Sequence, residues 1–265
     1  MSAIVTATGI SLRAAGRTIL APTDLALAAG ELTVVIGPNG AGKSTLLRIL
    51  AGEIAPASGT VLYGDTPVAA MPPWRLAAKR AVLPQSAQLA FPFTVAEVVR
   101  LGLDGAGNAA ERTDMMRRAL AAADVAHLAG RNYQTLSGGE QQRVQFARVL
   151  GQLMVGGRLE KHLALFLDEP VASLDLRHQL GLLEHARRLA GEGVAVLAIL
   201  HDLNLAAAYG DRLVVMKAGA VFADGSPGKV LTDALLRDVF DVRLSVGAVP
   251  ATPFVLPRPA TGGAA

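Results

Sequence analysis

The sequence predicts an α/β fold with a mostly parallel sheet, an N-terminal antiparallel β part and an inserted helical subdomain. Three observations predict it. Apolar runs typical of buried strands recur at Leu32–Ile36, Leu163–Leu167 and Val194–Leu200. Segments with helical spacing alternate with these runs, and such alternation indicates parallel strands covered on both faces. Residues 86–150 instead contain several helical patterns with few strand signals between them, which predicts the insertion.

The composition is that of a folded chain with a sizeable core. The 265 residues are 51% hydrophobic and 18% charged, the opposite of the balance found in disordered chains. The chain has no Cys, which excludes disulfides and thiolate metal sites. A net charge of +3 without a long basic run gives no indication of nucleic-acid binding. No apolar stretch reaches the roughly 20 residues of a membrane span, so we expect no direct membrane insertion.

The first third of the chain reads as a series of short elements. Strands are expected at Ile19–Leu27 and Leu32–Ile36, joined by a turn. A glycine-rich loop and a helix follow the second strand. A short β segment within residues 53–65, a helix over 72–80 and a strand over 81–85 complete this part.

The rest of the chain first becomes helical and then returns to alternation. Helices are expected at Val95–Leu103, Ala109–Ala123, Gly139–Leu153, Leu176–Ala190, Asn204–Tyr209 and Leu231–Phe240, with a further strand at Leu213–Met216. We therefore expect one domain over residues 1–246, made of a core (1–85 and 151–246) and a helical subdomain (86–150), then a Pro/Gly/Ala-rich tail (247–265).

The strongest motif is Gly37-x4-Gly42-Lys43-Ser44, which lies between a predicted strand and a predicted helix. This is the context of a phosphate-binding P-loop, and it predicts a P-loop NTPase core. Glycines let backbone N–H groups point at phosphate oxygens, and the helix presents its positive end to the same anion. The expected nucleotide-binding residues of the loop are Gly37, Pro38, Asn39, Gly40, Ala41, Gly42, Lys43, Ser44 and Thr45.

Two carboxylates end the apolar run at Leu163–Leu167. Buried carboxylates are costly without a partner, so Asp168 and Glu169 are unusual at the end of a core strand. Beside a P-loop, Asp168 and the Ser44 hydroxyl can hold Mg²⁺, and Glu169 can polarise the attacking water as a general base.

The third motif is Leu136-Ser137-Gly138-Gly139-Glu140-Gln141-Gln142-Arg143, a small-residue turn that opens a helix. This sequence resembles the signature of ATP-binding cassette (ABC) ATPases, and its position between the P-loop and Asp168-Glu169 matches the order in that family. In the family, cassettes dimerise head to tail and clamp each ATP between one P-loop and the partner's signature. The resemblance therefore implies a homodimer in which Ser137, Gly138 and Gly139 contact the partner's nucleotide.

Further family motifs match single residues. Gln85 resembles the Q-loop glutamine, which implies a role at the γ-phosphate and the Mg²⁺ ion. Asp175, in Ser-Leu-Asp, resembles the D-loop aspartate at the dimer interface. His201 resembles the switch histidine that contacts the γ-phosphate. The resemblance thus implies ATP hydrolysis with Glu169, His201 and Gln85 as catalytic residues.

One family position departs from the pattern. Many ABC ATPases stack adenine on an aromatic residue upstream of the P-loop, but the first aromatic residue here is Tyr63. The guanidinium of Arg13 or Arg17 could stack on the base instead. The remaining histidines, at positions 127, 162, 178 and 185, are interpreted as surface or packing residues.

The resemblance covers about residues 8–246 and points to a single-cassette importer subunit. The segments 84–102 and 199–232 resemble importers of ferric siderophores, cobalamin and heme. Two features resemble hemin-import ATPases most. They are the run Ser-x-x-Leu-Ala-Phe-Pro-Phe-Thr at 86–94 and the extended connection 151–162, which is interpreted as a loop insertion.

This resemblance implies a specific setting for the chain. It implies an ATPase that couples ATP to heme import through a permease dimer at the cytoplasmic face of the bacterial inner membrane, with a periplasmic substrate-binding protein acting indirectly. A ferric-siderophore or cobalamin importer is the alternative substrate interpretation. A regulator that never meets a permease, an exporter cassette and a non-hydrolysing cassette are the alternative classes.

Overall fold

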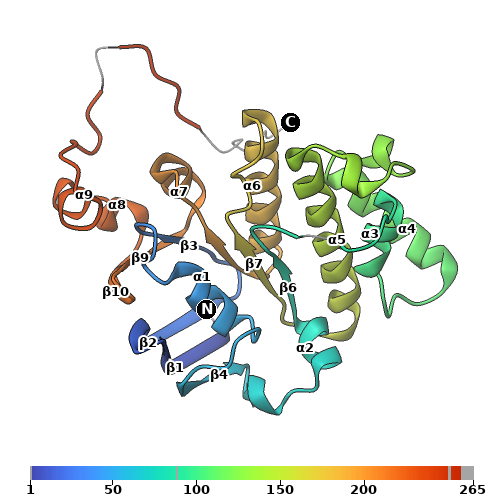
Figure 1. Cartoon of the computed structure of the whole chain (residues 1–265), viewed down its shortest axis with the longest axis horizontal. Coiled ribbons are helices and arrows are strands. Elements are labelled where there is room, and N and C mark those ends of the chain that lie inside the picture. Colours follow the sequence, from blue (N-terminus) through green and yellow to red (C-terminus); the bar gives the residue numbers. More distant parts are fainter. Residues whose placement is uncertain (1, 88, 250–251, 258–265) are drawn as a thin grey trace.

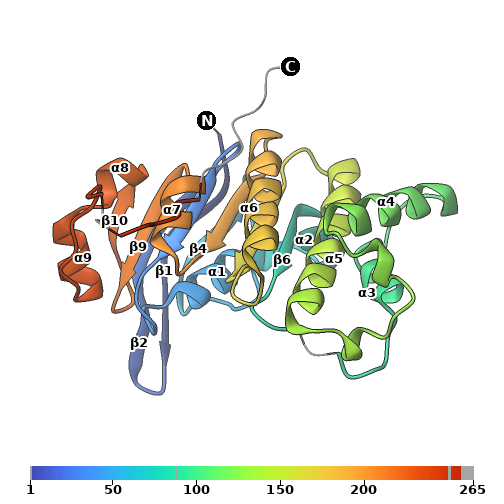
Figure 2. The same cartoon turned by 90° about the horizontal axis from the view of Figure 1, so that it is seen from above.

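The computed structural model describes residues 2–87, 89–249 and 252–257. These residues form two β-sheets with helices packed around the larger one (Figures 1 and 2). The strands are β1 (Ala3–Ala14), β2 (Arg17–Ala28), β3 (Leu32–Ile36), β4 (Ser58–Tyr63), β5 (Thr66–Pro67), β6 (Arg80–Leu83), β7 (Ala164–Asp168), β8 (Ala195–Ile199), β9 (Arg212–Lys217) and β10 (Ala220–Gly225). The α-helices are α1 (Lys43–Leu50), α2 (Pro73–Lys79), α3 (Val95–Leu101), α4 (Ala109–Ala122), α5 (Gly138–Leu159), α6 (Leu176–Gly191), α7 (Leu203–Tyr209), α8 (Pro227–Val230) and α9 (Asp233–Phe240).

The larger sheet is the predicted mostly parallel sheet. Its described strands lie in the order β10–β9–β3–β8–β7–β6, and only β10 pairs antiparallel to its neighbour. The central strands β3, β7 and β8 are buried throughout, which explains why each reads as a mainly apolar run, with Thr33 of β3 and Asp168 of β7 as polar exceptions. The smaller sheet, β2–β1–β4–β5, is antiparallel and is the predicted N-terminal β part.

Helix α1 lies between the two sheets. Its apolar residues Leu46, Leu47, Ile49 and Leu50 are buried in one cluster with side chains from both sheets, including Leu25 of β2 and Phe166 of β7. The P-loop helix is thus held on both sides, which fixes the position of its N-terminus.

The helical subdomain extends beyond the strand β6 edge of the large sheet (green in Figures 1 and 2). Helices α3 and α4 pack on α5, and apolar side chains of this unit belong to the same buried cluster as one face of the large sheet. Each of α3, α4 and α5 begins with a capping box, made by Thr94 with Glu97, Asn108 with Glu111, and Ser137 with Glu140.

The prediction of a loop insertion at residues 151–162 is wrong. Helix α5 continues to Leu159, well past the predicted end at Leu153. Its last turns are fixed on two sides, because Arg158 pairs with Glu111 of α4 at 2.6 Å and Glu160 pairs with Lys79 of α2 at 2.6 Å. Glycines at 151, 156 and 157 weaken the helical signal of this segment in the sequence.

Other differences are smaller. Strands β1, β5 and β10 and the single-turn helix α8 were not predicted. The predicted helices and strands are present, β3 with the predicted ends and most others with shifted ends. Residues 247–249 and 252–257 of the tail contain no helix or strand, and residues 250–251 and 258–265 lie outside the described residues. No helix in the described part of the chain is long and apolar enough to cross a membrane.

Candidate functional site

The candidate site lies at the carboxyl ends of four neighbouring parallel strands. Strands β3, β8, β7 and β6 are adjacent in that order. The P-loop follows β3, His201 follows β8, Glu169 follows β7, and Gln85 follows β6. Residues that are far apart in the sequence therefore meet at one edge of the sheet, where ligands of open α/β sheets bind.

The glycines of the P-loop allow close approach of the backbone. Gly37 has φ 148°, and a Cβ there would lie 2.2 Å from the Met216 carbonyl oxygen of β9. Gly42 has φ 93°, and a Cβ there would lie 2.7 Å from the Ile19 carbonyl oxygen of β2. Side chains at these positions would push the loop away from both sheets.

The N-terminus of α1 is open to an anion. Among the described residues, no side chain caps its first turn, and the helix has no acidic residue there. Helices α3, α4 and α5 instead have capping boxes with a glutamate. Because the first N–H groups of a helix need acceptors, α1 leaves this function to a ligand such as phosphate.

Lys43 is buried beneath the P-loop. Its Nζ donates to the carbonyl oxygens of Gly37 at 2.9 Å and Pro38 at 3.0 Å. Burial lowers the pKa of the Lys43 ammonium, and the nearby Glu169 and Asp168 carboxylates act in the opposite direction. The ammonium is thus held by the carbonyl groups of the loop, and the carboxylates of Glu169 and Asp168 favour its charged form.

Asp168 and Ser44 form the pair expected at a magnesium site. The Ser44 hydroxyl donates to Asp168 Oδ1 at 3.1 Å. Asp168 is buried, and burial raises the pKa of its carboxyl group, although the bond from Ser44 acts in the opposite direction. A hydroxyl, a carboxylate and the nearby Gln85 amide are hard ligands of the kind that Mg²⁺ prefers, so this donor set fits the ion.

Glu169 is held by two side chains from neighbouring strand ends. Gln85 Nε2 donates to its Oε2 at 2.8 Å, and His201 Nε2 lies 2.5 Å from its Oε1. Its backbone has φ 49°, a left-handed conformation that is costly for a residue with a side chain. Glu169 is therefore in direct contact with Gln85 and with His201, the other two residues predicted to be catalytic.

Most of these residues line one open pocket of about 660 Å³, but Asp168 is not part of its lining in the described structure. Its lining residues are Ile19, Asn39, Gly40, Ala41, Gly42, Lys43, Ser44, Thr45, Gln85, Glu169 and His201. Gly37 and Pro38 contribute instead the carbonyl groups that bind Lys43.

Ile19 was not predicted from the sequence as a site residue. In the described structure it lines the pocket, whereas Arg13 and Arg17, the suggested adenine partners, do not. Both arginines lie near the β1–β2 turn and are exposed. The sequence has no motif that marks Ile19. It joins the site because β2 passes close to the P-loop at Gly42 in the fold.

The signature residues line a different pocket, of about 450 Å³. Ser137, Gly138 and Gly139 at the start of α5 form one wall, and Asp175, the N-cap of α6, forms another. In the described part of the chain, this pocket shares no residue with the P-loop pocket. The P-loop residues and the signature residues thus line two separate pockets of the described chain.

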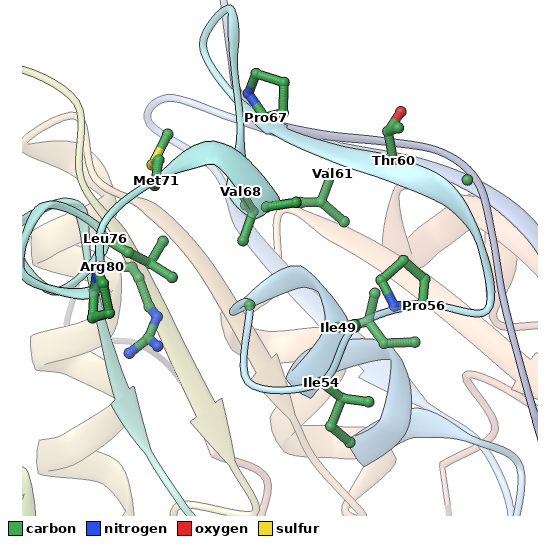
Figure 3. A pocket seen from close by; sticks show the side chains of 15 residues that line it. Ile49, Ile54, Pro56, Thr60, Val61, Pro67, Val68, Met71, Leu76 and Arg80 are labelled. Carbon is green, nitrogen blue, oxygen red and sulfur yellow. The ribbon is translucent and has the colours of Figure 1, made fainter.

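A third pocket, of about 490 Å³, is mostly apolar and lies away from the catalytic residues (Figure 3). Side chains of α1, β4 and α2, among them Ile49, Val61 and Leu76, line it, with Arg80 at one side. Arg80 is bound to the Ala51 carbonyl oxygen at 2.6 Å. Among the described residues, its lining includes none of the P-loop residues 37–45 and none of Gln85, Glu169 and His201.

Comparison with known proteins places these features in a family. A family model described as ABC transporter matches residues 20–172, from β2 to just beyond Glu169. The chain belongs to the ABC transporter family. The cassette is 47% identical to the Hemin import ATP-binding protein HmuV of Rhizobium meliloti (strain 1021), over 97% of this chain and 100% of that protein. It is 48% identical to the protein of the same name from Rhodopseudomonas palustris (strain ATCC BAA-98 / CGA009), over 97% and 96% of the two chains.

Solved cassettes share the fold. The ADP conformation of MJ1267, an ATP-binding cassette of an ABC transporter, matches with a TM-score of 0.75 at 24% identity, over 91% of this chain and 99% of that one. The cassette MJ0796, solved as a dimer in a post-hydrolysis state with ADP and Pi, matches with a TM-score of 0.71 at 26% identity, over 84% and 98%. The predicted fold class and family resemblance are confirmed.

Proposed function

We propose that this cassette is the ATP-hydrolysing subunit of an ABC importer that drives heme import through a partner permease. The observation that carries the ATPase is the contact of Glu169 with both Gln85 and His201 beside the P-loop. Support for heme comes from identity near 47% over almost the whole chain to hemin import ATP-binding proteins of several bacteria. A ferric siderophore or cobalamin is the alternative cargo that the test must exclude.

The P-loop binds the triphosphate of ATP. The first N–H groups of α1 and the loop backbone donate to phosphate oxygens, and the Lys43 ammonium moves from the carbonyl groups of Gly37 and Pro38 to the β- and γ-phosphates. Because Lys43 is held only by carbonyl groups, phosphate offers it stronger, charge-assisted hydrogen bonds.

Ser44, Asp168 and Gln85 would hold the magnesium ion. Bound Mg²⁺ neutralises charge that develops on the phosphate oxygens. The Ser44 hydroxyl donates to Asp168 Oδ1 at 3.1 Å, so these two groups lie close together.

Glu169 acts as the general base toward the attacking water. Its carboxylate accepts from Gln85 and pairs with His201, and these contacts orient it at the end of β7. His201 contacts the γ-phosphate from the end of β8, and Gln85 reports the state of the site to the region that follows it.

The second half-site completes the ATP pocket in a homodimer. Ser137, Gly138 and Gly139 contact the nucleotide held by the partner's P-loop, and Asp175 lies at the subunit boundary. The P-loop and the signature residues line separate pockets in the described part of one chain, and this separation supports the arrangement.

The cassette dimer docks on a permease dimer at the cytoplasmic face of the inner membrane. The segment Phe91–Leu103 follows Gln85 and includes α3. Phe91 is 68% exposed, and its ring meets the edge of Phe93 with the ring centroids 6.3 Å apart, so the segment offers an aromatic surface to a partner. A periplasmic binding protein delivers heme to the other side of the permease.

Purification from membranes tests this function. Tagged cassette should copurify with an integral membrane protein, and the complex in proteoliposomes should accumulate heme when ATP is supplied. The Lys43→Ala complex should assemble but accumulate no heme. Accumulation of a ferric siderophore or cobalamin in place of heme would overturn the cargo, and a cassette without an integral partner would overturn the importer.

A further inference from the structure

His178 on α6 was interpreted from the sequence as a surface or packing residue. In the structure its ring lies at a junction between Asp175, which precedes α6, and Asp124, which follows α4. His178 lines the signature pocket together with Asp175. We propose that His178 is a positioning residue that holds Asp175 and joins the loop before α6 to the helical subdomain. By these contacts His178 shapes the wall of the signature pocket that faces the partner's nucleotide. This inference rests on the proposed ATPase function.

The imidazole of His178 contacts Asp175 directly. Nδ1 lies 2.8 Å from Asp175 Oδ1, and the backbone N–H of His178 donates to the same oxygen at 3.0 Å. These two hydrogen bonds lower the pKa of the Asp175 carboxyl group, so they favour the carboxylate that acts as the N-cap of α6. The two hydrogen bonds from His178 therefore orient the side chain of Asp175.

The other ring nitrogen faces the helical subdomain. Nε2 of His178 is buried and lies 3.5 Å from Asp124 Oδ2, without a hydrogen bond in the described structure. Asp124 follows the C-terminal end of α4 and has a left-handed backbone with φ 53°. The ring thus lies between carboxylates of two structural units, the core helix α6 and the end of α4.

Asp124 gathers further contacts from both units. Its Oδ2 lies 3.8 Å from Arg143 of α5 and 3.6 Å from Arg177 of α6. The Arg143 guanidinium also donates to the Asp124 carbonyl oxygen at 2.5 Å. Arg143 is the last residue of the signature motif, so the junction connects Asp175 to the same helix that carries Ser137.

The loop and the signature are close enough for this positioning to matter. A Cβ on Gly139 would lie 2.8 Å from the Ser173 carbonyl oxygen, so the start of α5 abuts the loop before α6. A small displacement of that loop would therefore alter the wall of the signature pocket. His178 supplies a side-chain contact that opposes it, because the N–H of Nδ1 donates to the Asp175 carboxylate at 2.8 Å.

Two substitutions separate the roles of the ring nitrogens. His178→Ala removes the contacts of both ring nitrogens, with Asp175 and with Asp124, whereas the side-chain amide of His178→Asn retains a donor near the position of Nδ1. His127→Ala, at an exposed histidine outside the junction, is the matched control. All variants are measured as the full chain, with melting temperatures to verify folding.

The readouts are ATP hydrolysis and amide hydrogen exchange. We expect His178→Ala to lower kcat about tenfold with ADP affinity for the P-loop unchanged, and to speed exchange in residues 171–178 but not in 37–45. His178→Asn should restore most of kcat. Equal kcat for wild type and His178→Ala, or equal losses in the Ala and Asn variants, would overturn the proposal.

The exchange measurement separates this proposal from the proposed function. It is made on the nucleotide-free chain and does not depend on ATP hydrolysis. If exchange at 171–178 is unchanged in His178→Ala, the positioning role is wrong even when the wild type hydrolyses ATP. A wild type without ATPase activity would instead overturn the proposed function, and the exchange data would still decide whether His178 holds the loop.

Discussion

At the scale of single residues, the site depends on one carboxylate held by two partners. Glu169 has a strained backbone, and its two carboxylate oxygens contact Gln85 and His201. Strain of this kind persists only where the surrounding structure fixes it, and it concentrates at functional sites. The two residues follow the ends of β6 and β8, the strands on either side of β7 in the sheet.

Glu169→Gln should lose ATP hydrolysis while keeping ATP binding. An amide of nearly the same shape cannot accept a proton from the attacking water, so we expect kcat to fall by about 10²- to 10⁴-fold. Phosphate release measures the rate, and Glu192→Gln at an exposed position is the control. A rate near that of the wild type would refute the assignment of Glu169 as the base.

Single residues can be singled out in the sequence where a motif encodes backbone chemistry. The P-loop glycines and Asp168-Glu169 stand out because they come where apolar strands end. Ile19 and His178 could not, because their contacts depend on elements that pack together only in the fold.

At the scale of elements, α5 connects the signature to α2. It begins at the Ser137 cap, and the following Glu160 pairs with Lys79 of α2. Gly156 allows the close contact, since a Cβ there would lie 2.4 Å from the Ala78 carbonyl oxygen. The glycines that obscured this helix in the sequence are thus partly required by its packing.

Gly156→Ala and Gly157→Ala should change stability in opposite directions. Alanine favours a helix over glycine by up to about 1 kcal/mol, and at Gly157 the new Cβ meets Leu163 at an ordinary 3.6 Å. At Gly156 the backbone clash should cost about 1–3 kcal/mol. Urea denaturation measures both, and a stabilised Gly156→Ala would contradict the tight α2–α5 contact.

The pair of Arg158 with Glu111 should make the stability of the α4–α5 contact depend on pH. Arg158 donates to both Glu111 oxygens, which lowers the pKa of that carboxyl group in the folded chain. The stabilisation is therefore present above the ordinary Glu pKa of about 4.3 and is lost as pH falls through the lower, folded pKa.

Thermal melts of Arg158→Ala check this dependence. Its Tm should lie below that of the wild type at pH 7, and the difference should shrink on acidification below about pH 4. Glu111→Gln should give a similar loss at pH 7, and the double variant should lose little more. A difference in Tm that stays constant down to acid pH would show that charge is not its origin.

At the scale of the whole molecule, the strand order brings the P-loop, Gln85, Glu169 and His201 into one pocket, and the signature residues line another. The sequence indicated parallel strands but not their order, since order depends on which crossovers pack best. The order β3–β8–β7–β6 is what brings four distant segments together. The signature, at the start of α5, lines its own pocket.

ATP should bring two copies of the chain together. In Glu169→Gln, bound ATP cannot be hydrolysed, so each P-loop nucleotide should be clamped by the partner's signature residues. Sedimentation should show a dimer with ATP and a monomer with ADP, and adding Lys43→Ala should abolish the dimer. A monomer with ATP at concentrations that saturate binding would contradict the paired half-sites.

Growth on heme tests the central claim most directly. A strain that lacks this chain is supplied with heme as its only iron source, with a ferric siderophore as the control source. The account predicts loss of growth on heme alone, restored by the wild-type chain but not by Lys43→Ala. Normal growth on heme, with loss on the ferric siderophore, would contradict heme as the cargo.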